Sequence, residues 1–150
     1  MTYSTSKSRL RLWLRLLKLS RIVEAQLREK MRREFNSTLP RFDVLAALSR
    51  TPEGLRMSDL SSTLKVSNGN VTGIVDRLVN DDLATRVPVP GDRRAAKICL
   101  TASGRKQFDI QAKAHERMIN QLLGGFSAEE AQTLTEHFDS ILRMPLGERA

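Results

Sequence analysis

The chain has 150 residues, which is enough for one domain with a buried core, or for a small unit with an added assembly surface, and excludes two large domains. Its formal net charge is +8, from 25 Lys and Arg against 17 Asp and Glu, and this favours an anionic partner. Residues 1–35 carry 10 basic and 3 acidic side chains, residues 36–105 carry 10 and 7, and residues 106–150 carry 5 and 7. The positive excess therefore lies mostly in the first segment.

The first predicted element is a helix from Leu10 to about Glu34, after a Ser/Thr-rich start at residues 1–8 that we expect to fray. Two lines of apolar residues at helical spacing give this helix an unusually wide apolar surface. The first line consists of Leu12, Leu16, Leu19, Val23 and Leu27. The second consists of Leu10, Trp13 or Leu14, and Leu17. The interspersed basic residues exclude a signal peptide or a membrane span, so we expect a soluble protein.

A second helix is predicted to follow, with Pro40 in its first turn, where proline is tolerated. A turn at residues 51–54 separates it from a short helix at about 58–64. Ser67 is then predicted to cap a helix running to about Asn80. Two short helices joined by a tight turn predict a helix-turn-helix, whose second helix enters the major groove of DNA.

The second helix of this pair has a predicted buried side, formed by Val71, Ile74, Val75 and Leu78, and an outward side. Gly69 and Gly73 lie on the outward side, although each costs about 1 kcal/mol of helix stability relative to alanine. We expect the glycines to allow close approach to DNA, while Asn68, Asn70, Thr72 and Arg77 reach bases or phosphates; tolerated glycines without a function are the alternative. Asp76 is expected to pair with a nearby arginine or with a cytosine amino group.

Residues 83–87 and 96–100 alternate between apolar and polar side chains and predict a hairpin. The loop between them is expected to carry Asp92, Arg93 and Arg94 at its tip, with Asp92 orienting one arginine through a bidentate pair. Such a basic finger suits insertion into a narrow minor groove, and a solvated turn without a partner is the alternative. A helix-turn-helix followed by this hairpin predicts a winged helix.

Two helices are predicted after the hairpin, the first capped by Thr101 and ended by Gly124 and Gly125, and the second opened by a capping box at residues 127–130. The fold class is therefore mainly α with a small β-hairpin wing. We expect residues 40–104 to form the winged helix-turn-helix, and residues 10–35 and 105–145 to form helices that pair two chains in a homodimer. Completion of a monomer core by the terminal helices is the alternative.

No residue pattern for catalysis, a cofactor or a metal is visible. His115 and His137 have no ligand at metal-binding spacing, and the single cysteine, Cys99, is expected to be a small strand residue instead of a redox switch. One unpaired cysteine also fits a reducing cytoplasm. We therefore expect a protein that is not an enzyme, needs no cofactor and does not bind membranes.

The block VSNGNVTGIVDRLVNDDLATR at 66–86 and the segment DRRAAKICLTASG at 92–104 resemble those of the MarR family of bacterial transcriptional regulators. The resemblance extends over residues 1–150 and implies a homodimer that binds a palindromic operator, usually represses, and is released by small ligands. It assigns DNA reading to Ser67, Asn68, Asn70, Thr72 and Arg77, and the wing to Asp92, Arg93 and Arg94. Asp82 departs from a glycine common in the family, but aspartate adopts the left-handed conformation, so the turn is expected to persist.

Within the family, the segments at 10–28 and 38–48 resemble those of regulators of aromatic-acid breakdown, including those that answer hydroxycinnamoyl-CoA thioesters. The resemblance implies an aromatic acid or aromatic acyl-CoA effector, with basic residues on the coenzyme A phosphates. The candidate contacts are Arg11, Trp13, Arg15, Arg32, Arg33, Arg41 and Phe42. Arginines that only solvate a helix and attract DNA nonspecifically are the alternative.

Three functions compete on this basis. A ligand-responsive repressor would have a sequence preference and release DNA on binding a small molecule. A ligand-independent architectural DNA-binding protein would bind tightly with neither property, and a protein-interaction module would not bind DNA at moderate salt. We favour the first function.

Overall fold

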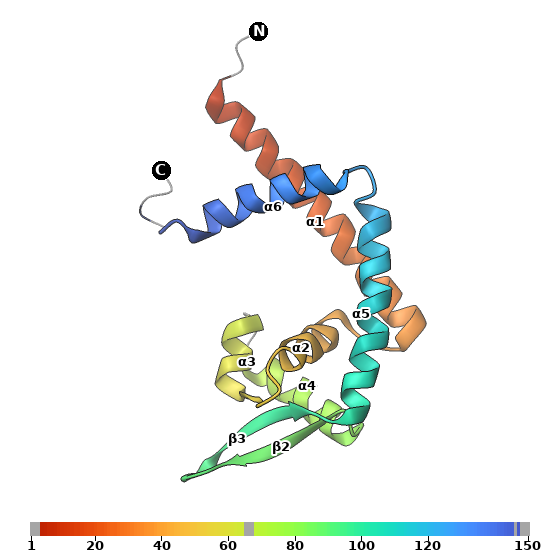
Figure 1. Ribbon diagram of the computed structural model, residues 1–150, viewed down its shortest axis with the longest axis vertical. Coiled ribbons are helices and arrows are strands. Elements are labelled where there is room, and N and C mark those ends of the chain that lie inside the picture. Colours follow the sequence, from red (N-terminus) through yellow and green to blue (C-terminus); the bar gives the residue numbers. More distant parts are fainter. Residues whose placement is uncertain (1–3, 65–67, 146, 148–150) are drawn as a thin grey trace. The chain divides into compact units, whose positions relative to one another are not determined.

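The computed structural model describes residues 4–64, 68–145 and 147, in two compact units that comprise Met1–Glu116 and Arg117–Ala150. The helices are α1 (Thr5–Phe35), α2 (Leu39–Ser49), α3 (Met57–Leu64), α4 (Asn68–Asn80), α5 (Ala102–Leu122) and α6 (Ala128–Arg143). The strands are β1 (Leu55–Arg56), β2 (Ala84–Val89) and β3 (Asp92–Leu100). The predicted fold class, mainly α with a small β wing, is confirmed (Figure 1).

The core of the first unit lies where α2, α3 and α4 pack together and against the base of the sheet (Figure 1). Its fully buried members come from each of these elements: Val44, Leu45 and Leu48, Leu60, Val71, Val75 and Leu78, and Ile98. On α4 the buried residues recur at spacings of three and four, as the sequence predicts, so one side of that helix is held against the core. The opposite side is left for solvent or a partner.

The sheet has three antiparallel strands in the order β1-β3-β2. Strand β1 was not predicted, because two residues are too short to show an alternating pattern. Its Leu55 lies opposite Ile98, so it covers one edge of β3 next to the core. The hairpin of β2 and β3 continues beyond the helices as a narrow two-stranded wing (Figure 1).

The wing is longer than the sequence pattern predicted. Only Pro90 and Gly91 form the turn, and Asp92, Arg93 and Arg94 begin β3 instead of lying in a loop. Gly91 has a φ of +81°, which with proline before it allows a tight turn. The expectation of a longer loop was wrong because, beyond a register shift after Pro88, Val89 pairs with Asp92 next to the turn.

Helix α1 begins at Thr5, so the expected fraying does not reach the described residues 5–8. It ends at Phe35, and its C-cap residue Asn36 adopts a left-handed conformation with a φ of 46°. Only Leu27 and Met31 of α1 are buried within the chain. Trp13 and three leucines near the start of the helix, Leu10, Leu12 and Leu14, are each 54–56% exposed. A single chain therefore leaves the apolar surface of the first half of α1 uncovered.

Helix α6 belongs to the second unit. Ser127 accepts a hydrogen bond from the Glu130 amide, and the Glu130 carboxylate accepts one from the Ser127 amide, which confirms the predicted capping box. No residue of α6 is buried, and Ile141 and Leu142 are 53% and 69% exposed. The described helices include none that is long and apolar enough to span a membrane.

Candidate nucleic-acid interface

Helix α4 presents one exposed face that can approach DNA. Thr72, Gly73 and Arg77 are exposed on it, as is Asn70, while Val71, Val75 and Leu78 anchor the other face in the core. Ser67 lies outside the described residues, and neither the side chain of Asn68 nor the exposure of Gly69 is described. We call the exposed residues Asn70, Thr72, Gly73 and Arg77 the reading face.

The surface at Gly73 is open. A Cβ atom built on Gly73 meets no heavy atom within 4 Å, apart from its chain neighbours and the adjoining backbone of its helix. Nothing in the described part of the fold therefore requires glycine at this position, so its role in close approach to a partner stays a prediction.

Replacement of Gly73 by alanine should stabilise the protein and weaken DNA binding. Alanine lowers the entropic cost of the helix by up to about 1 kcal/mol, which corresponds to a rise of about 2–4 °C in the unfolding midpoint. The added methyl group should reduce DNA affinity because it holds the helix away from the groove floor. Thermal unfolding and fluorescence anisotropy measure the two effects, and an unchanged DNA affinity would refute the steric explanation.

An ion pair fixes α4 relative to the wing. The Arg86 guanidinium of β2 donates a hydrogen bond to the Asp76 carboxylate of α4, which confirms that Asp76 pairs with a nearby arginine. The pair compensates a negative charge on the exposed side of α4 that would otherwise repel phosphates. Arg86 did not figure among the predicted site residues, because its partner is ten positions away on another element.

A second ion pair joins the start of α2 to the segment after α4. Arg41 Nη2 lies 2.5 Å from Asp81 Oδ2, and the arginine side chain is only 21% exposed. Asp82 follows with a φ of 58°, so the predicted left-handed turn is confirmed. Together these features define where α4 ends and where the wing begins.

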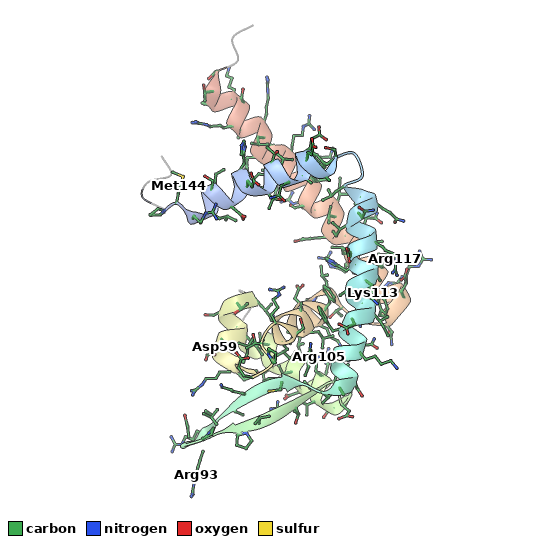
Figure 2. All side chains as sticks on the ribbon, in the orientation of Figure 1. Asp59, Arg93, Arg105, Lys113, Arg117 and Met144 are labelled. Carbon is green, nitrogen blue, oxygen red and sulfur yellow. The ribbon has the colours of Figure 1, made fainter. Side chains whose placement is uncertain are left out.

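Arg93 and Arg94 lie at the far end of the wing, next to its turn. Arg93 and Arg94 are exposed, and Figure 2 shows Arg93 pointing away from the rest of the hairpin. Asp92 does not form the expected bidentate pair with an arginine; its Oδ1 accepts a hydrogen bond of 3.1 Å from the backbone amide of Arg94. The carboxylate thus shapes the start of β3 and leaves the two guanidinium groups without a partner among the described residues. Both groups remain available for phosphate or minor-groove contacts.

The wing is joined to α5 by a compact junction. Thr101 Oγ1 accepts a hydrogen bond from the Gly104 amide, which confirms Thr101 as the cap of α5, and it also donates one to the Asp82 carbonyl. Gly104 packs against the backbone at Leu83, where a Cβ would lie 1.8 Å from the carbonyl oxygen. This junction explains the Thr-x-x-Gly spacing of the sequence: threonine caps the helix and glycine permits the contact.

The expected ligand residues are spread along α1 and the start of α2. Arg15 and Arg32 are 17 positions apart on one helix, which separates them by about 25 Å along its axis. Arg11, Trp13 and Arg15 lie near the exposed start of α1, whereas Arg32 and Arg33 lie in its last turn. The two groups of candidates therefore lie near opposite ends of α1.

The remaining ligand candidates already have partners in the fold. Arg41 is paired with Asp81. Phe42 is buried, and its ring stacks on Phe108 and His115 at centroid distances of 5.7 and 4.9 Å. Burial raises the pKa of the adjacent Asp43, an effect that His115 opposes and Glu24 reinforces. This part of α2 and α5 forms a packed aromatic cluster.

Arg32 is held by Glu29 through two hydrogen bonds, Nε to Oε2 at 3.0 Å and Nη2 to Oε1 at 2.6 Å. The hydrogen bond from Arg32 lowers the pKa of Glu29 and raises that of the guanidinium. Arg32 also borders a cleft beside the reading face of α4 that the sequence did not reveal, because its walls come from elements far apart in the chain. No three metal-ligating side chains gather anywhere in the described parts of the chain.

Comparison with known proteins agrees with this geometry. A sequence model described as MarR family matches residues 36–95. The crystal structure of a MarR family transcriptional regulator from Silicibacter pomeroyi is 33% identical, with a TM-score of 0.74 over 94% of this chain and 97% of that one.

Two curated relatives match over shorter segments. The transcriptional activatory protein BadR of Rhodopseudomonas palustris is 35% identical over 104 residues, which are 67% of this chain and 59% of BadR. The homoprotocatechuate degradative operon repressor of Escherichia coli is 25% identical over 73% of each chain. The match thus spans less than two thirds of BadR. BadR is named as an activator, whereas the Escherichia coli protein is named as a repressor.

Proposed function

This chain belongs to the MarR family of transcriptional regulators, and on that premise we propose that it is a homodimeric repressor that binds a palindromic operator and releases it on binding a small aromatic ligand. The observation that carries the DNA-binding part is the exposed reading face of α4, together with a wing whose Arg93 and Arg94 have no partner among the described residues. A helix in the major groove and arginines at the flanking groove suit one half-site.

The exposed apolar surfaces of the terminal helices support the homodimer. Each of the two helices exposes large apolar side chains to water, and exposure of so much apolar surface is unfavourable in free energy. These side chains are Leu10, Leu12, Trp13 and Leu14 on α1, and Ile141 and Leu142 on α6. A second copy of the chain is the partner we propose for both surfaces, since a two-fold axis doubles the DNA contact and matches a palindrome. Residues 10–35 and 105–145 would then be the dimerisation region, and residues 40–104 the DNA-binding region.

Ligand response and repression are proposed by analogy. The homoprotocatechuate repressor supports an aromatic acid as the effector class and repression as the sign of regulation, whereas BadR supports activation. One ion pair ties α4 to β2 and another ties the segment after α4 to α2; they offer a physical basis for release, because DNA contact depends on how these elements are held.

Selection of bound sequences from a random DNA pool, followed by analytical ultracentrifugation, tests this function. We expect an inverted repeat with half-sites centred about 10 base pairs apart, or a multiple of that spacing, bound by two copies of the chain. Aromatic acids and their CoA thioesters are then titrated against the complex. Tight binding without sequence preference or release would indicate an architectural protein instead, and the absence of DNA binding at moderate salt would refute the proposal.

A further inference from the structure

The pairing between the two long strands of the wing shifts near the turn. Residues 84–88 of β2 pair with residues 96–100 of β3 in antiparallel order, and the next pair is Val89 with Asp92. Residues 93–95 of β3 therefore have no counterpart on β2. Extra residues on one strand form a β-bulge, which bends the strand and redirects its side chains. We call residues 93–95 the wing bulge.

The turn that precedes the wing bulge consists of Pro90 and Gly91. Gly91 has a φ of +81°, and proline followed by glycine with a positive φ is typical of a type II turn. A two-residue turn of this type splays the strands that it joins, because its twist does not match theirs. A bulge next to the turn increases the local twist, so the turn and the shifted register are compatible with each other.

The Asp92 carboxylate stabilises the wing bulge. Its Oδ1 accepts a hydrogen bond of 3.1 Å from the backbone amide of Arg94, a residue that β2 does not pair. Ala95 adds little to a regular ladder, because alanine is depleted in strands. The residues after the turn thus supply a local hydrogen bond where cross-strand pairing is interrupted.

An unshifted register would present the wing arginines differently. It would place Pro90 opposite Arg94, with residues 91–93 in the loop. Arg94 would then be a regular strand residue, and Arg93 would lie in the loop. In the shifted register both arginines belong to the wing bulge and are exposed, and Figure 2 shows Arg93 directed away from the hairpin. The register therefore decides where the two guanidinium groups lie.

Space does not require glycine in the turn. A Cβ built on Gly91 meets no heavy atom within 4 Å, apart from its chain neighbours. The feature that favours glycine is its positive φ, because other residues adopt such a conformation rarely. Asparagine adopts it more often than most other residues, whereas a β-branched residue is strained there. A residue that avoids a positive φ would therefore disfavour this turn.

We propose that Gly91 is a positioning residue for DNA binding, because its left-handed conformation maintains the shifted register that directs Arg93 and Arg94 toward DNA. Gly91 has no side chain, so it acts through the two arginines. The inference rests on the proposed function in one respect, namely that the wing contacts DNA. It adds that this contact depends on a backbone conformation two residues before the first arginine.

The variants Gly91→Val and Gly91→Asn test the inference, and neither changes the net charge. Nuclear Overhauser effects between β2 and β3 of the DNA-free protein report the register, and circular dichroism verifies that both variants fold. DNA affinity is measured by fluorescence anisotropy at several salt concentrations, with the duplex selected from the random pool as the probe. The substitution to valine is also made in the double variant Arg93→Gln and Arg94→Gln.

We expect Gly91→Val to lose the pairing of Val89 with Asp92 and to bind DNA about tenfold more weakly. The slope of log affinity against log salt should fall in magnitude by about one for each arginine–phosphate contact that is lost, although no charge has been removed. Gly91→Asn should keep the register and stay within about twofold of the wild type in DNA affinity. In the double variant the valine should have no further effect, because the groups that it misplaces are absent.

Equal losses of DNA affinity in Gly91→Val and Gly91→Asn would overturn the inference, since they would assign the effect to the added side chain. An unchanged register or an unchanged salt slope in Gly91→Val would also overturn it, as would a further loss of affinity in the double variant. These outcomes leave DNA binding by the wild type intact. Absence of DNA binding by the wild type would refute the proposed function itself, and the positioning role with it.

Discussion

Replacement of Gly104 by alanine is expected to destabilise the protein by about 3 kcal/mol, despite the better helix propensity of alanine. The added Cβ would lie 1.8 Å from the Leu83 carbonyl oxygen and 2.8 Å from its carbon, and both are backbone atoms that cannot rotate away. That oxygen also accepts a hydrogen bond from the Thr101 amide at 3.1 Å, so relief of the clash disturbs the cap of α5. Urea denaturation should show a lower midpoint with an unchanged slope.

Gly73→Ala is the matched control for this prediction. The chemical change is the same and both glycines are helical, but the surroundings of Gly73 are open. The two variants should therefore change stability in opposite directions. A destabilisation below about 0.5 kcal/mol in Gly104→Ala would mean that the backbone at the contact between α5 and the wing base can shift at little cost in free energy. The junction would then not need glycine.

Removal of the wing arginines is expected to have the largest effect on DNA binding. The double variant Arg93→Gln and Arg94→Gln should bind DNA about 10- to 100-fold more weakly at low salt, because each guanidinium that contacts a phosphate or a narrow groove releases counterions on binding. The slope of log affinity against log salt should fall in magnitude by about one for each arginine that touches a phosphate in the wild type. Stability should not change, since neither side chain has a partner among the described residues.

Lys113→Gln is the charge control for the wing. Lys113 lies on α5, where Figure 2 shows it away from the tip of the hairpin that carries Arg93. Its removal alters the net charge by one without altering a proposed DNA contact, so the salt slope should stay close to that of the wild type. If the wing variant and the control had the same slope, Arg93 and Arg94 would act only through long-range attraction.

Local patterns predicted most of the elements. Apolar spacing located the buried side of α4, because a helix held on one side by a core must repeat at 3.6 residues. Capping residues located the starts of α5 and α6, since Thr101 and Ser127 each satisfy a free amide within three residues of their own position. These signals are short-range, so they are present in the sequence itself.

Long-range contacts were the part that sequence patterns did not predict. Strand β1 is defined only by its pairing with β3, and the length of the wing by the pairing of Val89 with Asp92. The candidate ligand residues were predicted from their chemistry alone. The sequence did not show that Arg41 pairs with Asp81 or that Phe42 stacks on His115, because these contacts arise from packing. The expected partner of Asp92 was wrong for a local reason, because its carboxylate accepts a hydrogen bond from the backbone amide of Arg94 two residues later.

The sequence by itself determined the helix-turn-helix, the wing, the reading face of α4 and the family to which the chain belongs. All of these depend on residues that lie near one another in the chain, where periodicity and capping operate. Only the tertiary structure decided that Asp76 is paired with Arg86, that Gly104 must approach Leu83, and that Arg28 and Arg77 border one cleft. These juxtapositions arise from packing of distant segments, and no local pattern encodes them.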